Sequence, residues 1–290
     1  MPPHRPAGNM PSDKYGDRWS RDESILALYL YCQVPFAKTK ANNPEVIRLA
    51  SLIGRTPASV ARKLGNFGAF DPLLAAQGIS GLTHTGTAAK VVWDEFHNRW
   101  DSLVRESARL LRAYSAPVAN DENLPDPAAA RDEEIIALPT GPSERRASVS
   151  VRLFQDFFRR AVLASYESIC CVCCLDLRPL LVASHIKPWA SDECTRSDPQ
   201  NGLCLCAIHD RAFDRGLIAV SEEHRVVIDP KVMASGQSFV RASLVSFDGK
   251  PVRMPTRFAP RTDLLAWHRE NIFGRSGLGI RARSATRATA

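Results

Sequence analysis

The sequence lacks the long apolar segments that a membrane protein needs. Its best uncharged apolar run, Ile25 to Cys32, is far shorter than the roughly 18 residues of a membrane-spanning helix. The first twenty residues are polar and rich in proline and glycine, without the apolar stretch of a secretory signal. No internal repeat is visible either. These absences exclude membrane-spanning and repeat proteins, and they predict a cytoplasmic protein with no membrane partner.

Charge is distributed unevenly along the 290 residues. The net charge is +7, but seven acidic residues and three arginines between Ala116 and Ser150 give that segment −4 and leave +11 on the remainder. With 44% hydrophobic and 24% charged residues, the chain has the composition of a globular protein and enough length for two cores. A basic folded portion favours a polyanionic partner such as nucleic acid. A merely basic protein is the alternative.

Composition divides the chain into five parts. We expect a disordered start over residues 1–17, a helical domain over 18–115 and an acidic, proline-rich linker over 116–150. A second domain over 151–273 and a basic disordered tail over 274–290 complete the chain.

The helical domain contains three consecutive helix starts. Ser20 to Glu23 has the spacing of a capping box, and Asn43-Pro44 and Thr56-Pro57 each place a cap before a proline. The last two helices are separated by a short turn with Gly54, which is typical of a helix-turn-helix. Any small helical bundle is the alternative.

A helix-turn-helix would present its second helix to DNA. That helix would expose Ser59, Arg62 and Lys63, with Arg55 at its entrance, and such groups contact phosphates and base edges. Helical periodicity also predicts one long helix over 88–114 and further helices over 151–166 and 262–273.

The second domain carries a strand, a second strand and a short helix. The apolar run 180–183 predicts a strand that delivers His185 at its end, and 203–206 predicts the second strand. A helix from Ala207 to Gly216 follows, and a β-hairpin over 216–228 comes next.

Two carboxylates lie on this short helix. Asp210 and Asp214 are four residues apart and therefore share one helical face, as two ligands of one hard cation need.

Three separated motifs support a family resemblance. They are Ser184-His185-Ile186-x-Pro188-Trp189, Asn201-Gly202-Leu203 and His209-Asp210-x-x-Phe213-Asp214-Arg215-Gly216-Leu217. In order and spacing they resemble an HNH endonuclease of the ββα-metal fold over residues 151–273. The segment 19–72 resembles the amino-terminal domain often found ahead of HNH modules in restriction endonucleases. The resemblance implies an α+β protein, with a helical, helix-turn-helix-like N-terminal domain and a ββα-metal HNH nuclease domain.

The resemblance also assigns roles to residues. His185 would be the general base that deprotonates the attacking water, and Asn201 would hold the neighbouring loop and orient His185. Asp210 and Asp214 would bind Mg²⁺ or another divalent cation such as Mn²⁺. The third motif letter is Asp210 rather than histidine, so His209 is the alternative ligand. Ser184 stands where several family members have a second metal ligand.

The cysteines predict a second, structural metal. Cys170-x-x-Cys173 and Cys206-x-x-His209 have the paired spacing of a Cys₃His zinc site. The overlapping pair Cys171-x-x-Cys174 leaves the register open, and buried reduced thiols are the alternative. Cys32, Cys194 and Cys204 are expected to be ordinary thiols.

These features together predict a metal-dependent DNA endonuclease acting on double-stranded DNA. Lys187, Arg211 and Arg215 are candidates for holding phosphates near the cut. A restriction nuclease, including a modification-dependent one, is the expected biology, and a mobile-element nuclease would share the chemistry. A homodimer is compatible with this function. The alternative from another class is a non-catalytic, zinc-stabilised DNA-binding regulator, which Ser184 favours.

Overall fold

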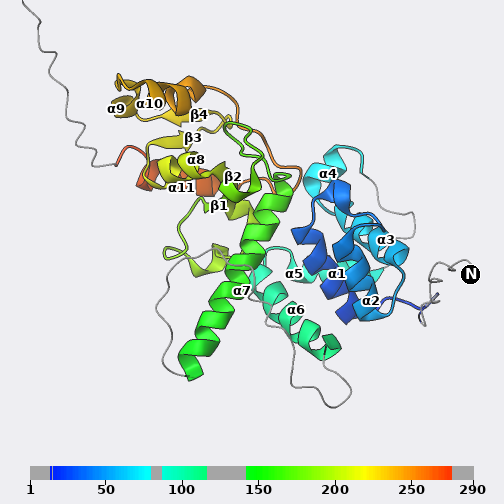
Figure 1. Ribbon diagram of the computed structural model, residues 1–290. Helices are drawn as coiled ribbons and strands as arrows, with labels where there is room; N and C mark the ends of the chain where they lie inside the picture. The colour runs from blue at the N-terminus through cyan, green and yellow to red at the C-terminus, as the bar shows by residue number, and fades with distance from the viewer. Residues whose placement is uncertain (1–13, 15, 80–86, 116–141, 276–290) are drawn as a thin grey trace, which may run out of the picture.

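A computed structural model describes residues 14, 16–79, 87–115 and 142–275 of the chain, and it shows a mixed α and β protein. Its first half is helical. The helices are α1 (Arg21–Gln33), α2 (Pro44–Ile53), α3 (Pro57–Gly68), α4 (Pro72–Ala76), α5 (Thr87–Phe96) and α6 (Trp100–Ser115), with a 3-10 turn at Phe36–Lys38. The long helix α7 (Pro142–Ser165) leads into the second half and lies between the two halves (Figure 1).

The first three helices begin where their caps predict. The Ser20 side chain accepts from the amide of Glu23, whose carboxylate accepts in return from the Ser20 amide, so the capping box is present. Asn43 and Thr56 cap α2 and α3 through side-chain hydrogen bonds. Gly54 ends α2 with a φ of 69°, in the left-handed region that favours glycine.

The single helix predicted over 88–114 is wrong. The structure breaks it into α5 and α6, because Asn98 takes a φ of 69° and cannot continue a right-handed helix. The break lets Trp93 on α5 and Trp100 on α6 both be buried. Other boundaries shift less: α7 starts at Pro142, inside the segment predicted to be a linker, rather than at residue 151. The rest of that linker, the predicted disordered start except residues 14, 16 and 17, and the tail from 276 lie outside the described residues.

The second half contains two small antiparallel sheets. Strand β1 (Leu181–His185) pairs with β2 (Gly202–Cys206) in a register that sets His185 opposite Gly202, and α8 (Ala207–Asp214) follows directly. Strands β3 (Ile218–Val220) and β4 (Val226–Ile228) form the second sheet. The remaining elements are α9 (Pro230–Met233), α10 (Ser238–Ser243) and α11 (Thr262–Asn271), with 3-10 turns at Arg178–Leu180, Glu193–Thr195, Pro199–Asn201 and Val245–Phe247.

Two glycines permit close packing in this half. A Cβ on Gly202 would lie 2.3 Å from a methyl group of Val162, so glycine lets β2 approach α7. Gly216 has a φ of 66°, and a Cβ there would lie 2.1 Å from the carbonyl oxygen of Ile272. No helix in the described part of the chain combines the length and apolarity needed to cross a membrane.

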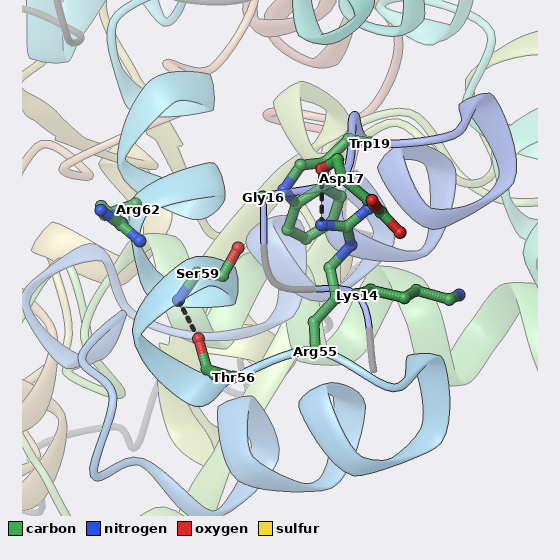
Figure 2. Close-up of a pocket in the computed structure, with 8 residues that line it drawn as sticks. All are labelled: Lys14, Gly16, Asp17, Trp19, Arg55, Thr56, Ser59 and Arg62. Atoms are coloured by element: carbon green, nitrogen blue, oxygen red, sulfur yellow. Dashed lines mark hydrogen bonds between the residues drawn. The ribbon is translucent and has the colours of Figure 1, made fainter. Parts of the chain in front are cut away.

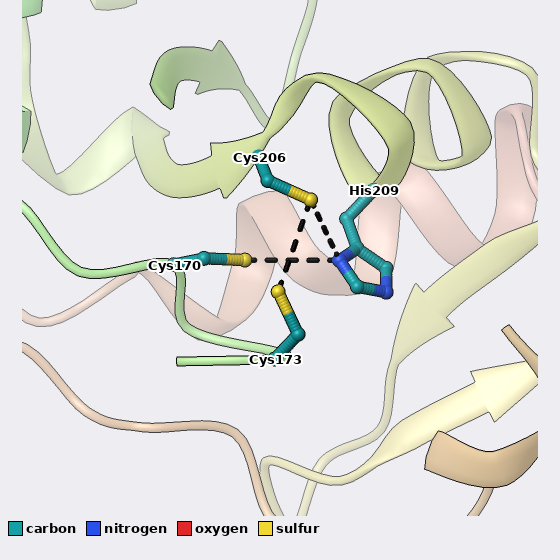
Figure 3. Close-up of side chains that lie close together, drawn as sticks. All are labelled: Cys170, Cys173, Cys206 and His209. Carbon is teal, nitrogen blue, oxygen red and sulfur yellow. Dashed lines mark hydrogen bonds between the residues drawn. The ribbon is translucent and has the colours of Figure 1, made fainter. Parts of the chain in front are cut away.

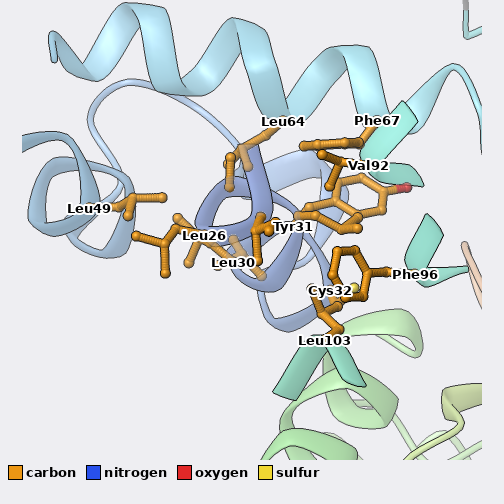
Figure 4. Close-up of a cluster of buried hydrophobic side chains, with 14 of the residues drawn as sticks. Leu26, Leu30, Tyr31, Cys32, Leu49, Leu64, Phe67, Val92, Phe96 and Leu103 are labelled. Atoms are coloured by element: carbon orange, nitrogen blue, oxygen red, sulfur yellow. The ribbon is translucent and has the colours of Figure 1, made fainter. Parts of the chain in front are cut away.

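The two halves share a hydrophobic core. Phe154, Phe157 and Ala161 of α7 and Phe258 are buried in the same cluster as the apolar residues of α1 to α6. Figure 4 shows part of this cluster, with α1 at its centre and α3 and α5 around it. The Phe157 ring stacks on Tyr29 of α1 at 5.5 Å between centroids. The second cluster lies on the other side of α7 and includes Phe158 and Val162.

A fully buried arginine joins the C-terminal segment to the end of α1. Arg257 donates hydrogen bonds to the carbonyl oxygens of Tyr31 at 2.5 Å and Val34 at 2.8 Å. Its guanidinium lies 4.5 Å from the centroid of the Tyr31 ring. The cation therefore satisfies carbonyls at the C-terminal end of α1, where the helix dipole favours positive charge.

We expect Arg257→Met to lower the free energy of unfolding by about 3–5 kcal/mol, because it leaves buried carbonyl oxygens without donors. Chemical denaturation of the full chain measures this loss. Arg253→Met is the matched control, since Arg253 pairs with Glu167 in a half-exposed ion pair worth about 1 kcal/mol or less. Equal losses in the two variants would contradict the role assigned to Arg257.

Candidate functional site

His185 lies at the end of β1 between two aromatic side chains. Its imidazole stacks on Phe158 of α7, with ring centroids 3.6 Å apart and planes 8° from parallel. The ring of Trp189 meets the imidazole edge-on at 5.7 Å. Because Phe158 follows Phe157, which packs on α1, the same turn of α7 contacts both the helical half and His185.

The hydrogen bonding of His185 fixes its tautomer. Nε2 lies 3.0 Å from the carbonyl oxygen of Arg196, and a carbonyl can only accept, so Nε2 carries the proton. Nδ1 of the neutral ring is then free to accept a proton. Burial lowers the pKa of His185 below its usual 6.5, while the bond to Arg196 opposes this shift. The imidazole is therefore neutral near pH 7, as a general base must be.

Asn201 ties together the loop that supports His185. Its side-chain oxygen accepts from the amide of Lys187 at 2.8 Å, and its Nδ2 donates to the carbonyl of Lys187 at 3.0 Å and of Thr195 at 3.2 Å. Thr195 directly precedes Arg196, whose carbonyl holds His185. Asn201 is 1% exposed, so it orients this loop rather than facing a substrate.

The two carboxylates of α8 interact with one another. Partial desolvation, and then repulsion from Asp210, raise the pKa of Asp214 to about 6, although Asp214 is still exposed at the helix surface, and desolvation also raises the pKa of Asp210. A pair of neighbouring carboxylates, one of which is destabilised by the charge of the other, is a donor set that a hard divalent cation would stabilise. Ser184, next to His185 on β1, is buried, and hydrogen bonding between its hydroxyl and Asp210 opposes the rise in the pKa of that carboxyl.

Three cysteines and a histidine form a compact group beneath β2 and α8 (Figure 3). The ligand atoms of Cys170, Cys173, Cys206 and His209 lie within 4.8 Å of one another. The sulfurs of Cys173 and Cys206 are 3.8 Å apart, and Nδ1 of His209 is 3.1 Å from Cys206 Sγ and 3.7 Å from Cys170 Sγ. A tetrahedral zinc with Zn–S bonds of about 2.3 Å separates its sulfurs by about 3.8 Å. The group could hold such a metal.

Hydrogen bonds and burial distinguish the side chains that belong to this group from their neighbours. His209 Nε2 donates to the carbonyl of Ser243 at 3.0 Å, which leaves Nδ1 unprotonated and turned to the sulfurs. Hydrogen bonds from the Cys170 thiol and then from the backbone amide of His209 lower the pKa of the Cys206 thiol. The alternative pair in the sequence, Cys171 and Cys174, does not belong to the group. Cys171 is buried, and Cys174 is exposed.

Comparison with known families agrees with this geometry. Residues 170–221 match the family model described as HNH endonuclease. This segment is similar to the HNH endonuclease family. The match contains His185, Asn201 and the whole Cys₃His group, and it ends with β3. No curated protein matches the chain.

The match to an HNH endonuclease domain indicates nuclease activity, with DNA as the substrate. Some side chains around the HNH segment were not found by sequence reasoning. Phe158 lies outside the matched residues, in the helix predicted over 151–166, and no motif marks it as a contact of His185. Arg196 acts through its backbone carbonyl, which no sequence motif can indicate.

The structure contradicts two of the predicted DNA contacts, because the side chains of Arg55 and Lys63 are buried and therefore do not face DNA. Arg55 donates two hydrogen bonds to Glu23, at 3.1 and 2.8 Å, and is only 7% exposed. The Lys63 ammonium lies 4.8 Å from the centroid of the Trp19 ring. Burial, helped by the charge of Arg55, lowers the pKa of Lys63 to about 8. Both cations therefore stabilise the packing of the N-terminal segment.

The other candidate contacts are more accessible. Arg62 is exposed, and with Ser59 it lines a cavity of about 300 Å³ at the start of α3 (Figure 2). Arg211 and Arg215 of the HNH domain are exposed at α8. Lys187 is paired with Asp192 at 2.9 Å. Among the predicted DNA contacts, three arginines are therefore exposed, one on the helical half and two beside the carboxylates of α8.

Proposed function

We propose that the chain is a divalent-metal-dependent DNA endonuclease in which His185 is the general base. The observation that carries this proposal is the hydrogen bond from His185 Nε2 to the carbonyl of Arg196. It leaves Nδ1 as the acceptor of a proton from the water that attacks the scissile phosphate. Stacking on Phe158 holds the ring in place, which favours proton transfer in one orientation.

The other residues prepare this step. Asn201 positions the loop that carries Arg196, so it acts on His185 rather than on DNA. Asp210 and Asp214 would hold the divalent cation, Mg²⁺ or Mn²⁺, from one face of α8. When bound, such a cation neutralises the phosphate and stabilises the departing oxygen.

The Cys₃His group would hold a structural zinc. It connects the loop before β1, which carries Cys170 and Cys173, to the junction of β2 and α8. Zinc there would fix α8 and its two carboxylates relative to the strand that ends at His185. With His209 in this group, Asp210 and Asp214 are left for the catalytic cation.

The helical half, residues 18–115, would read the DNA for the nuclease domain over 151–273. The α2–Gly54–α3 turn supports a helix-turn-helix arrangement with Arg62 and Ser59 facing the duplex. In such a division the reader selects the site and the HNH domain cuts it. We propose a restriction role, including a response to modified bases, as the biological setting.

The pH dependence of cleavage follows from the burial of His185. The base must be neutral, and burial lowers its pKa below 6.5, so the rate should hold down to about pH 6.5 and fall only below that. A pH profile of kcat/KM at saturating Mg²⁺ measures this acidic limb, the fall in rate at low pH. Phe158→Leu opens the site to water and should move the limb to higher pH. A limb centred above pH 7 in the unaltered protein would contradict the assignment.

Plasmid cleavage by the full chain tests the proposal. After treatment with chelator, activity on supercoiled DNA should return with Mg²⁺ or Mn²⁺ and not with buffer alone. Methylated and unmethylated plasmids in parallel test the modification-dependent role, which fails if both are cut equally. DNA binding without cleavage under every condition would favour the non-catalytic regulator, which the serine at position 184, in place of a metal ligand, also favours.

A further inference from the structure

A cavity of about 400 Å³ lies at the seam between the two halves, away from the nuclease site. It is lined by the C-terminal end of α1, the 3-10 turn after it and the start of α2 from the helical half. The other wall is the C-terminal end of α7 and the 3-10 turn before β1. We call it the seam cavity. On α7 its lining residues Arg160 and Leu163 lie on the opposite side of the helix from Phe158, which faces His185.

The seam cavity carries an excess of positive charge. Lys38 and Arg178 line it, and neither side chain has an ion pair or hydrogen bond within the described part of the chain. Arg160 also lines it and lies 3.9 Å from Asp156, a long and exposed contact. The two acids of the lining are paired with arginines outside it, Glu45 with Arg48 at 3.2 Å and Glu167 with Arg253 at 2.5 Å. Three cations are therefore left facing one small volume.

The rest of the lining differs from a simple anion site. Val34, Pro35 and Leu163 give the cavity an apolar wall. Gln33 also lines it, is 8% exposed, and has an amide oxygen that accepts no hydrogen bond among the described residues. A phosphate needs only the cations, whereas an apolar wall with an unused acceptor suits a planar ring that carries an amino or hydroxyl group.

The backbone at the seam cavity is unusual. Glu167 and Ser168 are consecutive, both line the cavity, and both have positive φ angles, 56° and 57°. Residues other than glycine rarely adopt this conformation, and strained backbone gathers at ligand sites. The amide of Ser168 bonds to the carbonyl of Leu163 at 2.7 Å, so the strained turn closes α7 at the cavity.

We propose that the seam cavity binds a nucleotide, with its phosphates on Lys38, Arg160 and Arg178 and its base against the apolar wall. The volume lies in the range of small-molecule sites. A DNA backbone would use the cations but would leave the apolar wall and the Gln33 oxygen unused. Because Lys38 belongs to the helical half and Arg178 begins the 3-10 turn before β1, the nucleotide would bridge the two halves and stabilise their packing.

Calorimetric titration of the full chain without DNA tests this proposal independently of nuclease activity. The probes are ADP, GDP, CDP, UDP and inorganic phosphate. At least one nucleoside diphosphate should bind more tightly than phosphate, and Arg178→Gln and Lys38→Gln should each weaken it about tenfold or more. The control Lys40→Gln removes an exposed cation that does not line the cavity and should leave affinity unchanged.

Three results would overturn the proposal. They are the binding of no nucleotide, the binding of phosphate as tightly as every nucleotide, and the same affinity in all three variants. A twelve-base-pair duplex is titrated in the same way. If Arg178→Gln weakens duplex binding while no nucleotide binds, the cavity contacts the DNA backbone instead. Cleavage assays play no part in these outcomes, so failure of the proposed endonuclease function would leave the result readable.

Discussion

Replacing His185 by alanine is expected to lower the rate of DNA cleavage by about 10²–10⁴-fold, the usual contribution of a general base. The imidazole is the group whose free nitrogen, Nδ1, can take the proton of the attacking water. DNA affinity should change little, because the exposed arginines that we assign to DNA are untouched. Single-turnover cleavage of a labelled duplex, with binding measured in the presence of Ca²⁺, separates the two effects.

The matched control for this variant is His224→Asn. His224 lies in the turn before β4 with a φ of 56°, a conformation that asparagine tolerates well. This variant should cleave at the rate of the unaltered protein. Thermal unfolding of both variants checks that the loss at His185 is not a loss of folding. If His185→Ala cleaves within a few-fold of the unaltered rate, His185 is not the base.

Local signals in the sequence were sufficient for much of this architecture. The caps at Ser20, Asn43 and Thr56 each depend on one side chain and an amide two or three residues away, so they can be read from short segments. The strand that ends at His185 and the helix that ends before Gly216 were likewise marked by apolar runs and a glycine. Interactions of this range do not depend on the rest of the fold.

Long-range contacts account for what the sequence could not predict. Arg257 and the end of α1 are more than two hundred residues apart, and nothing near Arg257 indicates that it is buried. Arg55 looked like an exposed cation because its partner, Glu23, is on another helix. The break at Asn98 depends on burying two tryptophans at once, which helical periodicity alone does not report.

The candidate site was predictable in part from local motifs, and in part it depends on long-range contacts. The order and spacing of its motifs were visible in the sequence, but the role of His209 was open between two metals. The structure places its Nδ1 among three sulfurs, so distance provides what spacing could not. Phe158 shows the opposite limit, since its contact with His185 depends on how α7 crosses the sheet.

The second large effect is expected at the Cys₃His group, where Cys173→Ser should abolish metal binding and destabilise the HNH segment. In zinc-finger peptides the bound metal contributes about 10–16 kcal/mol to folding. Here the segment also has an apolar core around β1 and β2, so we expect a smaller loss, about 4 kcal/mol or more. The metal content of the purified protein and its free energy of unfolding, before and after chelation, measure both quantities.

The neighbouring residue offers the control. Cys174 is exposed and outside the group, so Cys174→Ser should keep the metal and the stability of the unaltered protein. If instead the two variants unfold alike and no zinc is found in either, the cysteines are ordinary buried thiols. The comparison also bears on catalysis, because α8 begins directly after Cys206 and carries Asp210 and Asp214. Losing the metal would release the helix that holds the carboxylates while His185 stays on its strand, so Cys173→Ser should lose cleavage and keep DNA binding by the helical half.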